Sequence, residues 1–421
     1  MNKVKLGEIL KIKHGFAFKS ENYVDESEYA LVTLANISST NNFQFNKDKT
    51  TFYGASFPND FILKEDDLIM PLTEQVVGLF GNTAFVPKMQ GITFVLNQRV
   101  GKVVPVDDKA DKYYLHYLLA TNLVKDQLEF RASGTRQRNI SPDDVYDVEV
   151  FLPDITTQRK IGKCLYDIEK KVNSNNAIND NLAYQLKDIY NYWFNQFDFP
   201  HNDKHQYKAD GGLMIWNDKI KRKIPAGWEI KSFGELCSLR NGINYDKSVE
   251  GDKMYRIINV RNISSSDLIL NENDLDEISL PQKQGNKYCV SENSIIVARS
   301  GIPGATRILQ KPSSNIIFCG FIICCTPCDD IYKYYLMFYL KQLEGSAATK
   351  TGGSILQNVS QDTLSNLPVP IPPQSLLREF NQIVSQSLEL IHSNMQENTQ
   401  LLKLRDWLLP MLMNGQATIS D

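Results

Sequence analysis

A heptad pattern of apolar side chains runs through two stretches of the chain. Steps of four and three residues connect Ile161, Leu165, Ile168, Val172, Asn175, Asn179, Leu182, Leu186, Ile189 and Trp193. The same steps connect Phe380, Val384, Ser387, Ile391, Asn394, Asn398, Leu401, Arg405, Leu408 and Leu412. This period is typical of helices that pair along one face. Pro153 and Pro372 come just before these stretches, where a helix needs no amide donor. The pattern predicts two long helices, at 153–198 and 372–415.

The remaining sequence alternates short apolar runs with polar turns. Runs rich in β-branched residues, such as 92–96 and 294–298, are interrupted by clusters of Gly, Asn and Asp, which predicts strands joined by loops. Two further stretches, at 112–128 and 331–343, favour shorter helices. The regions outside the long helices should therefore mix α and β structure.

The second half of the chain repeats the first. Leu6-Gly7-Glu8-Ile9 returns as Phe233-Gly234-Glu235-Leu236, and Asn36-Ile37-Ser38-Ser39 returns as Asn262-Ile263-Ser264-Ser265. At a constant offset of 219 residues, Gly134, Asn139, Ser141, Asp143, Pro153 and Arg159 match Gly353, Asn358, Ser360, Asp362, Pro372 and Arg378. Copies of this length are domains rather than the short units of a solenoid. We predict a first domain at 1–152, a helix at 153–198, a linker at 199–224, a second domain at 225–371 and a helix at 372–415.

Four asparagines occupy the middle of the two heptad seams. Asn175 and Asn179 correspond through the repeat to Asn394 and Asn398. Each large apolar residue buried along a seam contributes roughly 1.5–3 kcal/mol, so the two helices should pair. Buried Asn lowers stability but fixes register; the alternative is a wet, loosely packed stretch. The predicted fold is α+β, with two homologous mixed α/β domains joined by two long antiparallel coiled-coil helices in pseudo-two-fold symmetry.

Composition and motifs exclude several classes of function. Hydrophobic residues make up 42% and charged residues 23%, as in globular proteins, and the net charge of −3 neither supports nor excludes nucleic acid. With no membrane span or signal peptide visible, and an odd number of cysteines, we expect a cytoplasmic chain with reduced thiols. We find no phosphate-binding loop, dinucleotide fingerprint or metalloprotease motif, so we expect no catalysis, cofactor or metal. The Cys325–Cys328 spacing permits zinc or redox use, but small core residues fit better.

The order of these motifs resembles the specificity (S) subunits of Type I restriction–modification enzymes. The features that match are the duplicated Gly-Glu opening, Ile224-Pro225-Ala226-Gly227-Trp228 before the second copy, the Asn-Ile-Ser blocks, the Ala298-Arg299-Ser300-Gly301 turn and the proline-led helix starts. The first copy departs from the pattern because no Pro-x-Gly-Trp precedes Leu6. The resemblance implies two target-recognition domains, each reading half of a split double-stranded DNA sequence, with the helices setting the gap. It also implies docking of two methyltransferase (M) subunits, joined by restriction (R) motor subunits. Methyl transfer from S-adenosylmethionine would belong to those partners.

Two kinds of loop are candidates for contact with DNA. Loop 132–141 carries Arg136, Gln137 and Arg138, and its counterpart carries Lys350, Thr351, Ser354 and Gln357. The turn at 299–307 carries Arg299, Ser300 and Arg307. These side chains can donate to base edges or phosphates; unequal drift of two surface loops and the geometry of a hairpin are the alternatives. Lys19, Arg99, Arg240 and Arg261 are weaker candidates.

Two other functions stay open from the sequence. A non-enzymatic coiled-coil scaffold could use the two domains to bind proteins, and an enzyme with an unrecognised site is the third alternative. Affinity that falls steeply with salt would favour DNA over an apolar protein interface.

Overall fold

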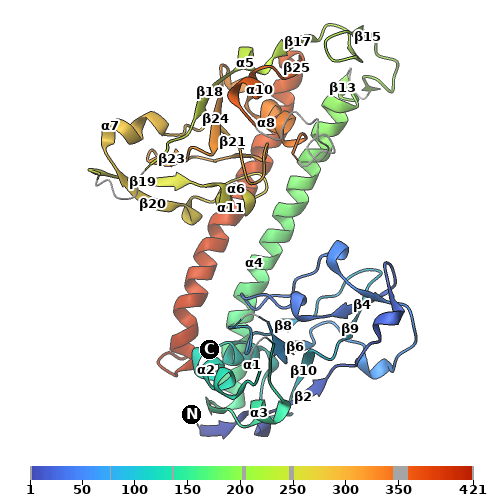
Figure 1. Ribbon diagram of the computed structural model, residues 1–421, viewed down its shortest axis with the longest axis vertical. Coiled ribbons are helices and arrows are strands. Elements are labelled where there is room, and N and C mark those ends of the chain that lie inside the picture. Colours follow the sequence, from blue (N-terminus) through green and yellow to red (C-terminus); the bar gives the residue numbers. More distant parts are fainter. Residues whose placement is uncertain are drawn as a thin grey trace. The chain divides into compact units, whose positions relative to one another are not determined.

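The chain forms two compact units. The computed structural model describes residues 2–75, 77–134, 137–201, 205–245, 251–344 and 359–419, with the side chain of His205 left out. Unit 1 comprises Met1–Val172 with Thr399–Asp421, and unit 2 comprises Asn173–Asn398. The long helices predicted from the heptads are α4 (Ile155–Tyr190) and α11 (Gln374–Met413), each of which contributes to both units (Figure 1).

Unit 1 is built on a four-stranded antiparallel sheet in the order β2-β10-β6-β8, beside a mixed sheet in the order β3-β5-β4-β9. Its elements are β1 (Asn2–Lys5), β2 (Leu10–His14), β3 (Tyr23–Val24), β4 (Tyr29–Val32), β5 (Phe52–Tyr53), β6 (Leu68–Pro71), β7 (Thr73–Glu74), β8 (Ala84–Phe85), β9 (Thr93–Leu96), β10 (Val100–Pro105), α1 (Lys112–Leu119), α2 (Asn122–Arg131), β11 (Arg138–Asn139), α3 (Pro142–Tyr146) and β12 (Glu149–Leu152). Strands β1 and β12 pair with each other, as do β7 and β11.

Unit 2 repeats the first sheet in the order β18-β24-β21-β22, beside a mixed sheet of three strands in the order β20-β19-β23. Its elements are β17 (Glu229–Ser232), α5 (Phe233–Leu236), β18 (Cys237–Asn241), β19 (Lys253–Ile258), α6 (Val260–Ser264), β20 (Asp276–Leu280), α7 (Gln282–Gly285), β21 (Ile295–Ala298), β22 (Thr306–Ile308), β23 (Ile316–Phe318), β24 (Ile322–Pro327), α8 (Lys333–Lys341), α10 (Gln361–Ser365) and β25 (Pro368–Ile371). The parallel pair β19–β23 corresponds to β4–β9, and β17–β25 corresponds to β1–β12.

The segment between the two copies is more ordered than a polar linker. It contains the short pairs β13 (Pro200–His201) with β14 (His205–Gln206), and β15 (Met214–Asn217) with β16 (Arg222–Pro225). Phe199 stacks on Trp228 with ring centroids 5.7 Å apart, and Ile224 is buried in the core of unit 2. These aromatic and apolar side chains join the connector to the core of unit 2.

Both long helices begin and pack as their sequences require. Asp154 caps α4 by accepting a hydrogen bond from the amide of Thr157 at 3.0 Å, which offsets one unpaired amide of the first turn. Hydrogen bonds from Thr157 hold the pKa of Asp154 below its usual value. After Tyr190 the chain continues as a π-helical turn, Asn191–Asn195. The ten seam residues of the first stretch, nine on α4 and Trp193 in the π-helical turn, are buried or half-buried, as are all ten of α11.

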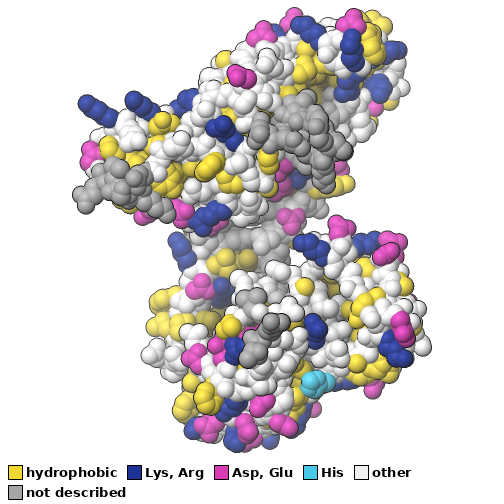
Figure 2. All heavy atoms as spheres, viewed as in Figure 1, with side chains coloured by type: hydrophobic (Ala, Val, Ile, Leu, Met, Phe, Trp, Pro, Cys, Tyr) yellow, Lys and Arg dark blue, Asp and Glu magenta, His cyan; other side chains and the backbone are white. Residues whose placement is uncertain are grey.

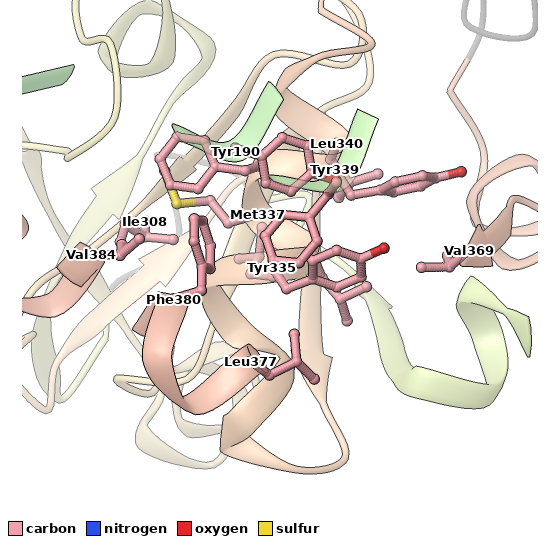
Figure 3. Close-up of a cluster of buried hydrophobic side chains, with 14 of the residues drawn as sticks. Tyr190, Ile308, Tyr335, Met337, Tyr339, Leu340, Val369, Leu377, Phe380 and Val384 are labelled. Atoms are coloured by element: carbon pink, nitrogen blue, oxygen red, sulfur yellow. The ribbon is translucent and has the colours of Figure 1, made fainter. Parts of the chain in front are cut away.

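Aromatic side chains join the helices to the domain within unit 2. Tyr190 of α4, Phe380 and Val384 of α11, and Tyr335 and Met337 of α8 converge in one buried cluster (Figure 3). Tyr190 stacks on Phe338 with ring centroids 5.7 Å apart. In unit 1 the equivalent cluster combines Ile161 and Leu165 of α4 with Leu412 of α11. Each helix is therefore held by apolar contacts with the domain beside it.

The predicted fold class is confirmed. Within unit 2, Asn175 contacts Asn398 and Asn179 contacts Asn394, so residue numbers rise along one helix as they fall along the other, and the pair is antiparallel. Adding the repeat offset exchanges these two contacts, which is what a pseudo-two-fold relation requires. No helix in the described part of the chain is long and apolar enough to cross a membrane.

Candidate nucleic-acid interface

The repeated Asn-Ile-Ser-Ser motif supports the domain frame. In unit 1 the Oδ1 atom of Asn36 accepts from the amide of Thr33 at 2.8 Å, and its Nδ2 atom donates to the carbonyl of Gln44 at 2.9 Å. Asn262 repeats both bonds in unit 2, with Asn259 and Asp274, each at 2.8 Å. Because both amides are occupied, the motif fixes a loop rather than presenting a free recognition group.

Arg138 of the first candidate loop is held against the protein. Its guanidinium lies 3.0 Å from Oε1 of Glu74 and donates to the carbonyl of Glu129 at 2.8 Å. Glu74 is only 1% exposed, and its other oxygen accepts from the amides of Leu79 and Phe80. The pair thus ties β11 to the loop that follows β7. Nearby, the half-buried Gln137 donates to Asn139 at 3.4 Å, and Arg136 lies outside the described residues.

The arginines of the second candidate turn are also engaged. Arg299 is half-buried and donates to the carbonyls of Gly320 and Val359 at 3.2 and 3.4 Å. Arg307 has a side chain only 5% exposed, paired with Glu344 at 3.0 Å. Burial alone would raise the pKa of Glu344, but hydrogen bonds from Arg307 and Lys341 lower it overall. These contacts favour bracing roles for both arginines.

Other predicted residues differ in what can be said of them. Ser300 is exposed at the tip of its turn. The remaining candidates of the second copy, Lys350, Thr351, Ser354 and Gln357, lie outside the described residues. Two buried carboxylates, Glu74 and Glu344, were not predicted from the sequence. No pattern marks them, because each meets its arginine only through tertiary folding.

The four seam asparagines form one hydrogen-bonded group in unit 2. Asn175 donates to Asn398 at 2.8 Å, and Asn394 donates to Asn179 at 2.8 Å. Asn175 also reaches Glu397, and Asn398 reaches Asn176, both at 2.8 Å. With Asn175 only 1% exposed, these amides are paired rather than wet, so a shift of register would break several bonds at once.

Charge on the described surface is mixed. On the face shown in Figure 2, Lys and Arg side chains are interspersed with Asp and Glu rather than gathered into one basic surface. No group of three or more potential metal ligands occurs among the described residues. Cys324 and Cys325 are buried on β24, as expected for core residues, and all seven cysteines are free.

Comparison with known proteins gives one family. A model of the Type I restriction modification DNA specificity domain matches residues 1–184 and again 225–402. The MjaIX specificity subunit of a Methanocaldococcus jannaschii Type I restriction enzyme is 23% identical over 335 residues, covering 77% of this chain and 73% of the relative. The HindI specificity subunit of Haemophilus influenzae is 24% identical over 359 residues, covering 72% and 77%. A Type I system S subunit from M. genitalium shares the fold, with a TM-score of 0.60 and 15% identity over 98% of this chain and 95% of that one.

Proposed function

The chain belongs to the family of Type I restriction–modification DNA specificity proteins, and we propose that it is the non-catalytic, DNA-reading subunit of such a complex. Each domain reads one half of a bipartite double-stranded site. The paired helices set the gap between the halves. Methyl transfer belongs to two M subunits and DNA cleavage to R subunits, so this chain itself needs no cofactor. The complex acts in the cytoplasm, with the DNA that it modifies.

One observation carries this proposal: the chain contains the same domain frame twice, with different side chains on it. The sheet order β2-β10-β6-β8 returns as β18-β24-β21-β22. The candidate loops differ in charge, since the first carries Arg136 and Arg138 in its sequence and the second carries Lys350 and Thr351. Two equivalent frames with different reading groups suit a sequence made of two unlike halves.

We assign two kinds of role to the residues predicted to contact DNA. Arg138, Arg299 and Arg307 brace the loops through buried acceptors. Gln137 and Ser300, with Arg136, Lys350, Thr351 and Gln357, remain the proposed DNA contacts on those loops. Braced loops suit recognition because a base is discriminated only when donors are held at fixed positions.

The helices supply register and docking surface in this proposal. Asn175, Asn179, Asn394 and Asn398 fix how far one helix runs past the other, and hence the gap. Large apolar side chains also remain exposed on the helices: Tyr184 and Leu390 within unit 2, and Leu404 and Trp407 within unit 1. Exposed aromatic residues commonly anchor protein interfaces, so we propose these as contacts for the M subunits.

Sequencing of modified bases tests the function directly. The chain would be co-expressed with its methyltransferase subunits in a host without other DNA methylation. We expect modified adenines in one split motif with a fixed gap, and none when the chain is omitted. A continuous motif, or methylation that does not depend on the chain, would contradict the proposal. Binding of the complex to DNA should fall steeply between 50 and 200 mM salt, as phosphate contacts require; weak salt dependence would favour the protein-binding scaffold.

A further inference from the structure

A tight turn after β9 is held rigidly in unit 1. The turn Asn97–Val100 closes with a hydrogen bond from the amide of Val100 to the carbonyl of Asn97 at 2.9 Å. Phe16 donates to Leu96 at 2.8 Å and accepts from Gln98 at 3.0 Å. The carbonyl of Arg99 accepts from the amide of Leu72 at 2.9 Å, directly before β7. The backbone of this turn is therefore fixed to two neighbouring segments.

The same hydrogen bonds recur after β23 in unit 2. The amide of Ile322 donates to Cys319 at 3.0 Å, and Ile243 donates to Phe318 at 2.9 Å. Gly320 donates to Ile243 at 2.7 Å, and the carbonyl of Phe321 accepts from Arg299 at 2.9 Å. Every backbone bond of the first turn thus has its counterpart, and Phe321 occupies the place of Arg99.

Two repeated glycines make this frame possible. A Cβ atom on Gly15 would lie 2.1 Å from the carbonyl oxygen of Asn97, and one on Gly242 would lie 2.1 Å from that of Cys319. Real side chains do not approach so closely, so only glycine lets the neighbouring strand end contact the turn. Gly15 and Gly242, which directly follow β2 and β18, are therefore explained by the turns that they support.

The two turns present different chemistry on this common frame. Arg99 is exposed, and its side chain has no hydrogen bond or ion pair within the described residues. Phe321 is 63% exposed and presents a phenyl ring at the same position of its turn. Each turn adjoins a loop already proposed to meet DNA, the first through Leu72 and β7, the second through Arg299. A rigid frame with unlike exposed tips is the arrangement expected of specificity elements.

We propose that Arg99 and Phe321 determine specificity, each for one base position of one half-site. Arg99 donates to the O6 and N7 atoms of a guanine in the major groove, the commonest arginine–base contact. Phe321 makes apolar contact with the methyl group of a thymine, since a phenyl ring has no donor to offer a phosphate. This inference rests on the proposed function and assigns reading residues within it.

The test uses Arg99→Ala and Phe321→Ala in the complete complex with its methyltransferase subunits. Modified adenines are mapped, and methylation rates are measured on duplexes that differ at single bases. Arg99→Ala should reduce discrimination at one position of one half-site by roughly 10- to 100-fold, leaving the other half-site intact. Phe321→Ala should do the same in the other half-site only. Melting temperatures of both variants should match wild type, because both side chains are exposed.

Two matched controls remove similar side chains elsewhere in the same units. Lys88 is an exposed cation before β9, at the opposite end of that strand from the Arg99 turn. Met254 is an exposed apolar residue near the start of β19, which runs parallel to β23 and so lies away from the Phe321 turn. Lys88→Ala and Met254→Ala should leave the motif unchanged.

Three results decide the matter. An unchanged motif in both test variants overturns the inference. Weaker methylation of all sequences with no change of base preference overturns it too, because it would place these side chains on phosphates. If the wild-type complex methylates no split motif, the proposed function is wrong. This result is obtained with the wild type alone, so it is distinguishable from failure of the inference about Arg99 and Phe321.

Discussion

At the residue scale, Glu169 is the centre of a buried polar network in unit 1. Its carboxylate accepts from the hydroxyl of Tyr117 at 2.8 Å and lies 3.4 Å from Nε2 of His116, whose Nδ1 lies 2.7 Å from Thr83. Burial alone would raise the pKa of Glu169, but His116, Tyr117 and the charge of Arg405 lower it overall. The network ties α4 to α1 and favours the charged carboxylate.

Replacing this carboxylate should destabilise unit 1 in a pH-dependent way. Because the pKa of Glu169 is lower in the folded chain, its charge stabilises the fold above the unfolded pKa of about 4.3. That stabilisation disappears as the pH falls through the folded pKa. Glu169→Gln should therefore cost about 1–3 kcal/mol at pH 7, and the deficit should shrink in acid. Urea unfolding of the wild type and the variant, at pH 7 and at acidic pH, measures this difference in unfolding free energy. Glu149→Gln, which breaks only a surface pair with Lys3, should cost under about 0.5 kcal/mol; a deficit that does not change with pH would refute the assignment.

Variants of Arg138 and Arg99 should distinguish an arginine that braces a loop from one that reads a base. Arg138→Ala leaves Glu74 buried without its cation, which should cost about 2–4 kcal/mol of stability. Arg99→Ala removes an exposed side chain and should change stability by less than about 0.5 kcal/mol. Thermal unfolding of the two variants gives the comparison. Equal melting temperatures would show that the Arg138–Glu74 pair does not brace the loop.

This residue scale is also where the sequence is least informative. The sequence marks Arg138, Arg299 and Arg307 as cations on loops, but it cannot reveal that folding brings acceptors from distant elements to each of them. Glu344 follows α8, whereas Arg307 lies on β22. By contrast, the Asn-Ile-Ser-Ser motif that contains Asn36 and Asn262 is visible in the sequence, because the repeat shows it twice.

At the element scale, the asparagine group makes register a measurable property. Asn175→Leu removes one hydrogen-bond donor from each of Asn398 and Glu397, which should cost about 1–3 kcal/mol of stability. Replacing Asn175, Asn179, Asn394 and Asn398 together by Leu should restore or raise the melting temperature, because an apolar seam is more stable. The complex with this fourfold variant should methylate sites with more than one gap.

The control for this experiment is Asn173→Leu, on the exposed side of the same helix. It should change neither the melting temperature nor the gap. A single sharp gap in the fourfold variant would mean that apolar packing and the domains fix the register without the amides.

Helices were predicted more completely than strands, for a physical reason. The heptad repeats over many turns, so one misplaced residue hardly weakens it, and all twenty predicted seam positions are buried or half-buried. Strands such as β7 and β11, with two residues each, carry no periodic signal. They exist because the loops around them pack, and no local pattern encodes that.

At the scale of the whole molecule, duplication is what made the architecture predictable. Two matched copies imply two equivalent domains and, through the heptads, one helix each. Internal matching also shows what must stay constant, such as Gly15 and Gly242, and what is free to differ, such as Arg99 and Phe321. A lone copy would have offered neither comparison, so these positions would have looked like ordinary turn residues.

The proposed spacer role predicts how the recognised sequence responds to helix length. One added heptad lengthens a helix by about 10 Å, close to the length of three base pairs at about 3.4 Å each. Inserted at matched positions in α4 and α11, it should abolish methylation at the original gap, and any motif that replaces it should keep both half-sites with a gap about three base pairs longer. Inserted in α4 alone, it leaves the seams mismatched and should abolish methylation. As a control, substituting only the exposed positions of one heptad keeps the helix length and should leave the gap unchanged. An unaltered gap after the paired insertion would refute the spacer role.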